Sequence, residues 1–143
     1  MYAKIVNNEV VVYPYNLIRL YKENPNVSFP AEIPEAILND YNIYSIAEAS
    51  VPSHDYNTQQ VIEVDPTLVD GVWTQTWTTP LLPTLTAKER VRGDRDERLK
   101  ETDYYALSDT PSMTTEMATY RQALRDVPSQ SGFPFSVTWP TKP

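Results

Sequence analysis

Few residues of this 143-residue chain could do chemistry. The single histidine, His54, stands beside Asp55 in a segment rich in Pro, Ser and Asn. A His–Asp pair becomes a catalytic dyad only when a nucleophile converges on it, and no pattern marks one. Motifs for a phosphate-binding loop, a nucleophile elbow or a zinc-binding helix do not occur, and the 3 glycines leave little backbone to surround a phosphate. We therefore expect His54 to be a solvated loop residue.

A second candidate is a group of carboxylates that follows Gly93. Their spacing lacks the calcium-loop pattern and its central glycine, and basic residues interleave with them. We expect a solvated helix face covered with ion pairs. The residues are Asp94, Asp96, Glu97, Glu101 and Asp103.

The tripeptide Arg92-Gly93-Asp94 matches an integrin-binding signal. It stands inside a predicted charged helix rather than at a loop tip, so we assign it no adhesion role. Gly93 costs a helix about 1 kcal/mol relative to Ala, which predicts a bend or break at this residue.

The residue census predicts a protein that is not an enzyme and that uses no cofactor and no metal ion. Because acidic residues are numerous, a glycoside hydrolase with paired carboxylates stays an alternative, and it would need a pocket where they converge. The chain has no Cys, which removes disulfides and thiolate metal sites and suits a reducing compartment.

The net charge of −7 is unevenly distributed. Residues 1–83 hold three basic and ten acidic side chains, whereas residues 84–143 hold nine of each. Nucleic-acid binding needs clustered Lys and Arg, so we expect no nucleic-acid partner. The sequence also lacks an apolar run of membrane-spanning length and a signal peptide, so we expect no membrane association and no export.

The beginning of the chain predicts a β-hairpin. Two β-rich runs, residues 2–6 and 9–13, are separated by Asn7 and Asn8, which tolerate the positive φ of a tight turn. Pro14 then ends the second strand.

Two short helices should follow. Asn16 is placed to cap the first one, and Pro25 ends it. A second helix is expected over residues 34–40, with proline in its first turn. A strand is expected within residues 42–49, although its apolar residues do not alternate strictly.

The clearest signal in the first half is a second hairpin. Asp70-Gly71 separates two runs of alternating polar and apolar residues, and this dipeptide favours a two-residue turn. Trp73 and Trp77 fall on the same face of their strand, where we expect them to anchor the core of a small sheet. An exposed binding stripe is the alternative.

A charged helix is expected over residues 87–102. Thr86 and Glu89 form a capping box at its start. Val91 and Leu99 are its only large apolar residues, so we expect it to be a connector or a face that waits for a partner.

A second helix, capped by Thr114 or Thr115, should run to Asp126 and form a hairpin with the first. Apolar residues recur along it at helical spacing. These residues are Met113, Met117, Tyr120, Leu124 and Val127. The connecting loop should pack Tyr104, Tyr105 and Leu107 back onto this stripe.

The chain closes on FPFSVTWPTKP, residues 133–143. Aromatic and aliphatic residues spaced by two predict a strand-like lid that covers Met117, Tyr120 and Leu124. They are Phe133, Phe135, Val137 and Trp139. The expected architecture is thus α+β, with an N-terminal antiparallel β meander carrying short helices over residues 1–83. A C-terminal helical hairpin with an extended Pro-rich and aromatic tail follows over residues 84–143.

The segment from Arg95 to the C-terminus resembles the C-terminal module of tail assembly chaperones and tail fibre assembly proteins of tailed bacteriophages. An Arg-Asp-x-x-Leu-x-x-Thr-Asp run ends at Thr102-Asp103, Tyr-Arg-Gln-Ala-Leu-Arg-Asp begins at Tyr120, and Val-x-Trp-Pro-x-x-Pro begins at Val137. The chain departs from the pattern at Tyr104, where such sequences often have Trp, and in its unusually charged first helix. The runs KIVNNEVVVYPY and LVDGVWTQTW and the SFP and IPE stretch also look like N-terminal parts found with this module.

The resemblance implies a non-enzymatic protein that helps a tail-fibre or other tail subunit to fold or trimerise. It implies action in the bacterial host cytoplasm during phage assembly, with retention in the virion as the alternative. A structural component of the tail, baseplate or fibre is the second hypothesis. Aromatic residues are the candidate partner-binding residues: Trp73, Trp77, Tyr104, Tyr105, Tyr120 and Trp139.

Overall fold

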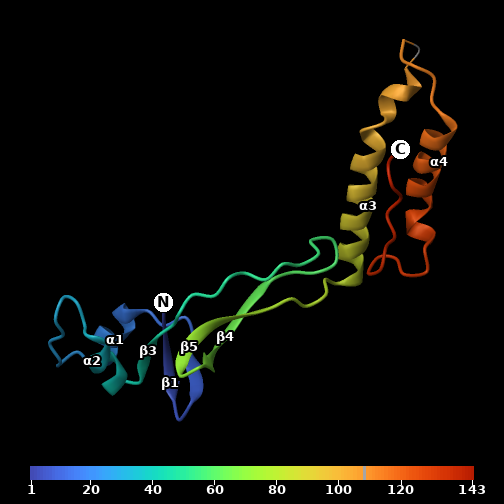
Figure 1. Ribbon diagram of the computed structural model, residues 1–143. Helices are drawn as coiled ribbons and strands as arrows, with labels where there is room; N and C mark the ends of the chain where they lie inside the picture. The colour runs from blue at the N-terminus through green and yellow to red at the C-terminus, as the bar shows by residue number, and fades with distance from the viewer. Residues whose placement is uncertain (108) are drawn as a thin grey trace. The chain divides into compact units, whose positions relative to one another are not determined.

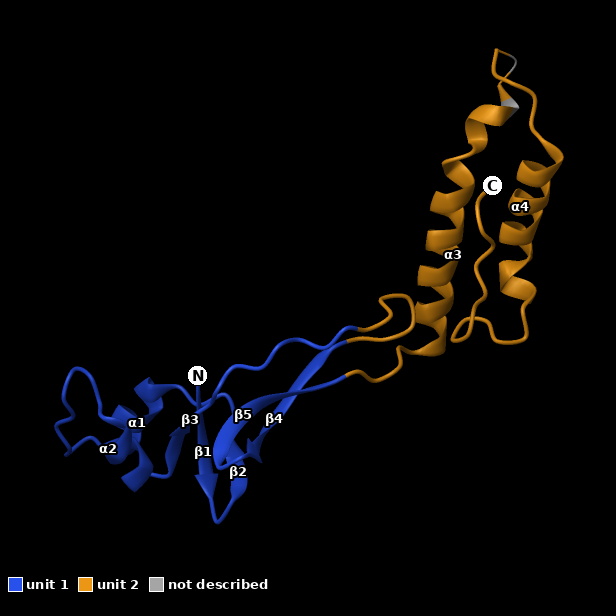
Figure 2. Cartoon of the chain, viewed as in Figure 1, with its two compact units in different colours: residues 1–53, 61–78 blue, residues 54–60, 79–143 orange. Residues whose placement is uncertain are grey.

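The computed structural model describes residues 1–107 and 109–143 and contains both strands and helices, which confirms the α+β class (Figure 1). The chain divides into two compact units (Figure 2). Unit 1 comprises residues 1–53 and 61–78, and unit 2 comprises residues 54–60 and 79–143. Within the described residues, no helix is long and apolar enough to cross a membrane.

Unit 1 contains a three-stranded antiparallel sheet of order β2-β1-β3. Its strands are β1 (Tyr2–Val6), β2 (Glu9–Val12) and β3 (Ile43–Ser45). Asn7 and Asn8 have φ values of 53° and 62°, so the predicted β1–β2 turn is confirmed.

Two short helices, α1 (Leu17–Glu23) and α2 (Glu35–Asp40), complete this part of unit 1. The Asn16 side chain accepts a hydrogen bond from the backbone N–H of Ile18, which confirms it as the N-cap of α1. The helices and the sheet share a core of Tyr15, Leu20, Leu38 and Ile43.

The predicted second hairpin is present as β4 (Ile62–Val69) and β5 (Val72–Thr78). Asp70 and Gly71 form its turn with φ values of 48° and 82°. Trp73 packs against a buried cluster of Ala3, Ile5 and Ile46, as expected of a core anchor.

Unit 2 is built on two helices, α3 (Thr84–Lys100) and α4 (Thr115–Asp126). Single 3-10 turns follow each helix, η1 (Asp103–Ala106) and η2 (Val127–Ser129). The hydroxyl of Thr114 accepts a hydrogen bond from the N–H of Met117, which confirms Thr114 as the N-cap of α4.

The predicted start of the charged helix is wrong. Thr86 does not cap α3, because the helix begins at Thr84, immediately after Pro83. The carbonyl of Pro83 accepts from the N–H of Ala87, so Thr86 already lies within the first turn. The predicted break at Gly93 is not seen either, since α3 is continuous through this exposed residue.

The apolar stripe of α4 is confirmed for four of its five residues. Met117, Tyr120, Leu124 and Val127 are buried, whereas Met113 is 36% exposed. The charged helix also buries more than predicted, because Ala87 and Val91 are fully enclosed and Leu99 packs against the α4 cluster. In the connecting loop, which includes undescribed residue 108, Tyr105 packs on the stripe, but Tyr104 and Leu107 are exposed.

The prediction of a strand-like lid over residues 133–143 is only partly correct. Residues 131–135 form a succession of turns, in which the Ser136 N–H donates to the Gly132 carbonyl at 2.7 Å. The two-residue alternation is lost there, since Pro134 is buried while Phe135 is 38% exposed. From residue 137 onward the chain is extended and runs back beside α3 and α4 (Figure 1). We call residues 137–143 the tail.

Candidate partner-binding site

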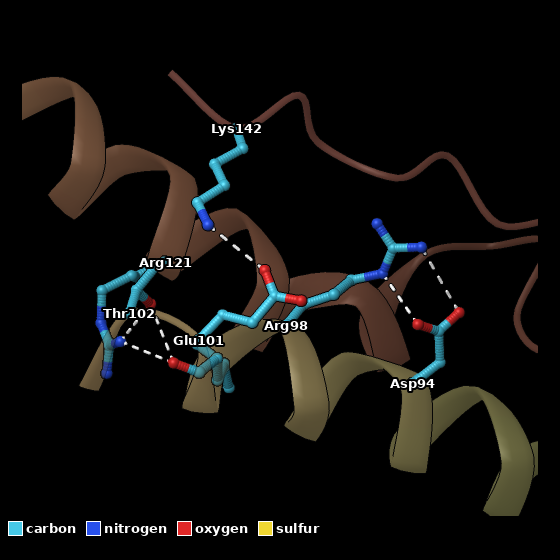
Figure 3. Close-up of polar contacts among 7 residues, drawn as sticks. Asp94, Arg98, Glu101, Thr102, Arg121 and Lys142 are labelled. Atoms are coloured by element: carbon cyan, nitrogen blue, oxygen red, sulfur yellow. Dashed lines mark hydrogen bonds and ion pairs between the residues drawn. The ribbon is translucent and has the colours of Figure 1, made fainter. Parts of the chain in front are cut away.

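Arg121 of α4 connects the two helices of unit 2. Its guanidinium donates to the Thr102 hydroxyl (Figure 3). It also donates to the Leu99 carbonyl and to an Asp103 carboxylate oxygen, both at 2.9 Å. Thr102 is fully buried, and its hydroxyl donates to the Leu99 carbonyl at 2.8 Å. One planar cation thus satisfies a carbonyl in the last turn of α3 and neutralises the carboxylate that follows it.

Gln130 holds the first part of the tail. Its side-chain amide donates to the Thr138 carbonyl at 2.9 Å, and its side-chain oxygen accepts from the Thr138 N–H at 2.8 Å. The amide therefore pairs with the backbone of the tail as a neighbouring β-strand would. This recognition does not involve the Thr138 side chain.

Trp139 is the apolar anchor of the tail. Its half-buried ring packs against Met117, Tyr120 and Leu124. The guanidinium of Arg98 lies 4.3 Å from the ring centroid, which is close enough for a cation–π interaction.

Arg98 is itself held in place by Asp94. Their side chains form an ion pair with an Nε–Oδ1 distance of 2.9 Å (Figure 3). Asp94 also accepts a hydrogen bond from the Asn57 amide at 2.9 Å. The contacts fix the plane of the guanidinium that covers the indole.

The end of the tail carries a third contact. Lys142 pairs with Glu101 at 3.2 Å, and the two side chains are 45% and 61% exposed (Figure 3). An ion pair this exposed contributes little stability but can select for charge. We call the surface formed by Arg98, Glu101, Gln130 and the Met117 cluster the tail-binding face.

The ion-pair face predicted for α3 is confirmed. Every carboxylate of the group singled out in the sequence has one basic partner within 4 Å. The pairs are Asp94–Arg98, Asp96–Arg95, Glu97–Lys100, Glu101–Lys142 and Asp103–Arg121. Two of these pairs reach beyond α3, so the charges are used for tertiary contacts and not only within the helix.

An open apolar groove of about 360 Å³ lies between α4 and the tail. The exposed side of α4 forms one wall, and the prolines of the tail form the other. Its lining comprises Thr115, Glu116, Thr119, Tyr120, Ala123, Pro140, Thr141 and Pro143. The groove continues the tail-binding face beyond the part that the tail fills.

The six predicted partner-binding residues fall into separate places. Tyr120 and Trp139 lie together on the tail-binding face, and Tyr105 joins the same cluster. Tyr104 stacks on Tyr105 with ring centroids 4.3 Å apart and is 47% exposed. Trp73 and Trp77 belong to unit 1, where the Trp77 indole donates to the Ala49 carbonyl at 3.3 Å.

Sequence reasoning missed Arg98 and Gln130 as residues that hold the tail. Arg90, Asp94 and Arg98 follow one another at four-residue spacing, which marks one face of a helix. That spacing could have indicated contacts with other segments, and Arg90 does donate to the Tyr56 carbonyl at 2.7 Å. No sequence signal identifies Gln130.

His54 is exposed in a loop of unit 2, as predicted. The neighbouring Asp55 accepts hydrogen bonds from the Asn57 N–H and the Thr58 hydroxyl, at 2.9 and 2.8 Å. Asp55 thus organises the loop. Among the described residues, no group of three or more His, Asp or Glu side chains is placed to hold a metal ion.

Unit 1 has its own polar cluster at Glu23. This carboxylate accepts from Lys4 at 2.9 Å, from Arg19 at 2.6 Å and from the Tyr15 hydroxyl at 3.2 Å. The hydrogen bonds from Lys4 and Arg19 lower the pKa of Glu23 to about 2. Burial and the Glu23 carboxylate raise the pKa of Tyr15 to about 12.

A similar pair joins two separate segments of unit 1. The Tyr13 hydroxyl donates to Glu63, and Gln75 donates to the same carboxylate oxygen at 2.7 Å. The Tyr13 hydrogen bond lowers the pKa of Glu63, while burial and that carboxylate raise the pKa of Tyr13 to about 12. The pair connects Tyr13, which directly follows β2, to Glu63 of the β4–β5 hairpin.

Residues 88–143 match the sequence model of the family described as "phage tail assembly chaperone protein". No curated protein and no solved structure matches the chain. The matched residues include all those of α4 and the tail and most of α3. They also contain the Thr102-Asp103, Tyr120-Arg121 and Val137–Pro143 runs, whose side chains form the contacts described above. From residue 88 onward, this protein therefore matches the phage tail assembly chaperone family.

Proposed function

We propose that this protein is a non-enzymatic chaperone that binds a tail-fibre or other tail subunit of a tailed bacteriophage during assembly. The family match over residues 88–143 carries the proposal. The geometry supports it, because the matched motif residues build a folded face with an open apolar groove.

The chaperone would act by covering apolar surface on an unassembled subunit. The groove offers apolar contact area, and polar groups at its margin can fix the orientation of a bound segment. Sites of this composition, apolar with a few placed polar groups, suit the binding of a peptide segment. Action in the host cytoplasm, before the subunit joins a particle, is part of the same proposal.

Co-expression tests this function. The chain would be produced with each candidate fibre and tail subunit of its phage, and soluble yield and co-purification would be measured. One subunit should become soluble, or remain bound, only when the chain is present. If no tail protein is retained or made soluble, the proposal is wrong.

A structural virion component is the competing function, and mass spectrometry of purified particles separates the two. A transient chaperone should be absent or far below the copy number of its subunit. Stoichiometric presence would favour a component that stays bound in the mature tail, baseplate or fibre.

A further inference from the structure

The tail is attached to unit 2 in the manner of a bound peptide. Among the described residues, the last backbone–backbone hydrogen bond along the chain runs from the Ser136 N–H to the Gly132 carbonyl, immediately before the tail. Within the described residues, Thr138 and Lys142 are the only tail residues with hydrogen bonds, and both bond to side chains of the module. Its main apolar contact is that of Trp139 with the Met117 cluster, and Val137 and Pro140 are half-buried beside it. Few, exposed hydrogen bonds characterise segments that open locally at low cost.

The turn before the tail depends on close approach at Gly132. A Cβ atom on Gly132 would lie 2.2 Å from the Ser136 carbonyl oxygen and 2.8 Å from its Cβ. Since one contact is with backbone, the chain itself would have to move. Gly132 therefore allows the tail to fold back onto the face, and a larger residue there should release it.

The contacts of the tail define the chemistry that the face recognises. Gln130 hydrogen-bonds to the backbone of Thr138, and Arg98 covers the ring of Trp139, the next residue. Glu101 pairs with Lys142, three positions after that ring. Pro140 follows the ring and lines the groove. The pattern is an extended x-aromatic-Pro-x-basic segment.

We propose that the tail-binding face is a peptide-docking site, that the tail is its internal occupant, and that an x-aromatic-Pro-x-basic segment of a tail subunit displaces the tail when it binds. The inference rests on the proposed chaperone function and names the chemistry of the segment bound. The adjoining groove gives an incoming segment additional surface that the tail leaves open. Because a closed tail blocks the site, the apparent affinity is reduced by the fraction of molecules that are open.

The test uses a fluorescein-labelled peptide of residues 136–143, SVTWPTKP, and fluorescence anisotropy with the full-length chain. Gly132→Ala should bind this peptide about tenfold or more tightly than the unsubstituted chain, because its tail is released. Gly93→Ala is the matched control: a Cβ at Gly93 meets nothing within 4 Å, and this chain should bind as the unsubstituted one does. The same peptide with Ala in place of Trp should bind at least tenfold more weakly.

A second variant, Gln130→Ala, tests the proposal independently in case Gly132→Ala does not fold. Gln130→Ala removes both hydrogen bonds to Thr138 without changing the core, and it weakens the hold on the tail while removing one contact for the peptide. Its tail should therefore exchange amide hydrogen faster at residues 137–143, with α3 and α4 unchanged. Equal peptide binding by folded Gly132→Ala and Gly93→Ala chains would overturn the proposal, as would unchanged exchange of the tail in Gln130→Ala.

The outcome is separable from that of the co-expression test. Solubilisation of a tail subunit without any peptide binding would remove the docking site and leave the chaperone function standing. Peptide binding without an effect on any tail subunit would leave the docking site standing and remove the chaperone function.

Discussion

Unit 1 and unit 2 are each stabilised internally by a different kind of interaction. In unit 1, antiparallel backbone pairing joins β1 to β2 and β3, and β4 to β5. In unit 2, helical backbone hydrogen bonds remain within α3 and α4, so side chains must hold the helices to each other and to the tail. A single side chain should therefore matter more to the tertiary structure of unit 2 than to that of unit 1.

The charges follow the same division. Unit 1 has three basic and nine acidic residues, whereas unit 2 has nine basic and ten acidic residues. Asp94 of α3 pairs with a base of the same helix, whereas Glu101 and Asp103, just beyond α3, pair with bases of the tail and of α4. The charges of unit 2 therefore contribute to its tertiary contacts. With nine acids and three bases, unit 1 cannot pair most of its acids internally. Two of its three bases, Lys4 and Arg19, form ion pairs with Glu23.

The largest expected effect is on the core of unit 2. Leu124 is fully buried, and Leu124→Ala should destabilise unit 2 by about 3–5 kcal/mol through lost burial and a cavity. Hydrogen exchange measured by mass spectrometry should show faster exchange in α3, α4 and the tail together. Leu20→Ala, which makes the same change in the core of unit 1, is the matched control. Faster exchange confined to α4 would contradict the view that side-chain contacts hold the helices together.

Arg121→Ala should cost about 2–4 kcal/mol, because it removes three charge-assisted hydrogen bonds from an 11% exposed side chain. Arg121→Lys should restore only part of the loss, since an ammonium lacks the planar fork of donors. Arg125→Ala, a change of an exposed arginine on the same helix, should stay within about 0.5 kcal/mol. Urea denaturation followed by circular dichroism measures the stability of all three variants. Equal effects of Arg121→Ala and Arg125→Ala would show that the Arg121 contacts to Leu99, Thr102 and Asp103 do not stabilise unit 2.

Trp139→Ala should destabilise unit 2 by about 2 kcal/mol. Full burial of this residue would predict about 3–5 kcal/mol, but the indole is half-buried and the groove side of the tail is open. Trp139→Phe should recover most of the loss, because a smaller ring can still lie under Arg98. An unchanged melting temperature for Trp139→Ala would show that the tail adds nothing to the stability of its unit.

Acid should weaken unit 1 at Glu23. The pKa of Glu23 in the folded protein is about 2, below its ordinary value of 4.5, so its contribution is complete above pH 4.5 and is lost as the pH falls toward 2. Hydrogen exchange of α1 and β1 between pH 5 and pH 2.5, corrected for intrinsic rates, should show this loss in the unsubstituted chain and a flatter profile in Glu23→Gln. Glu9→Gln is the control, since Glu9 forms no ion pair in the described part of the chain. The same profile in Glu23→Gln and the unsubstituted chain would show that another group is responsible.

What the sequence could predict here was local. Asn7-Asn8, Asp70-Gly71, Asn16 and Thr114 each act on backbone within a few residues, so their types and spacing were sufficient. The capping box at Thr86 failed because α3 starts earlier: Pro83, with φ −52° and ψ 139°, is its N-cap, and Thr84 is its first residue.

The tail-binding face could be predicted only in part. The apolar periodicity of α4 identified Met117, Tyr120 and Leu124 as one surface, and Trp139 as its cover. The polar half of the face joins segments far apart in the chain, as in the contact of Arg98 with Trp139 or of Glu101 with Lys142. Spacing along one helix cannot reveal such pairs, and the turn at Gly132 that makes them possible has no periodic signal.

The bidentate contact of Gln130 has a consequence for how this sequence can change over time. Gln130 binds the N–H and the carbonyl of Thr138 and leaves the exposed hydroxyl unused. Position 138 can therefore accept almost any amino acid without loss of the contact, and only proline, which lacks an N–H, should be refused. Natural variation at this position would alter the outer surface of the protein while the anchored tail beneath it stays the same.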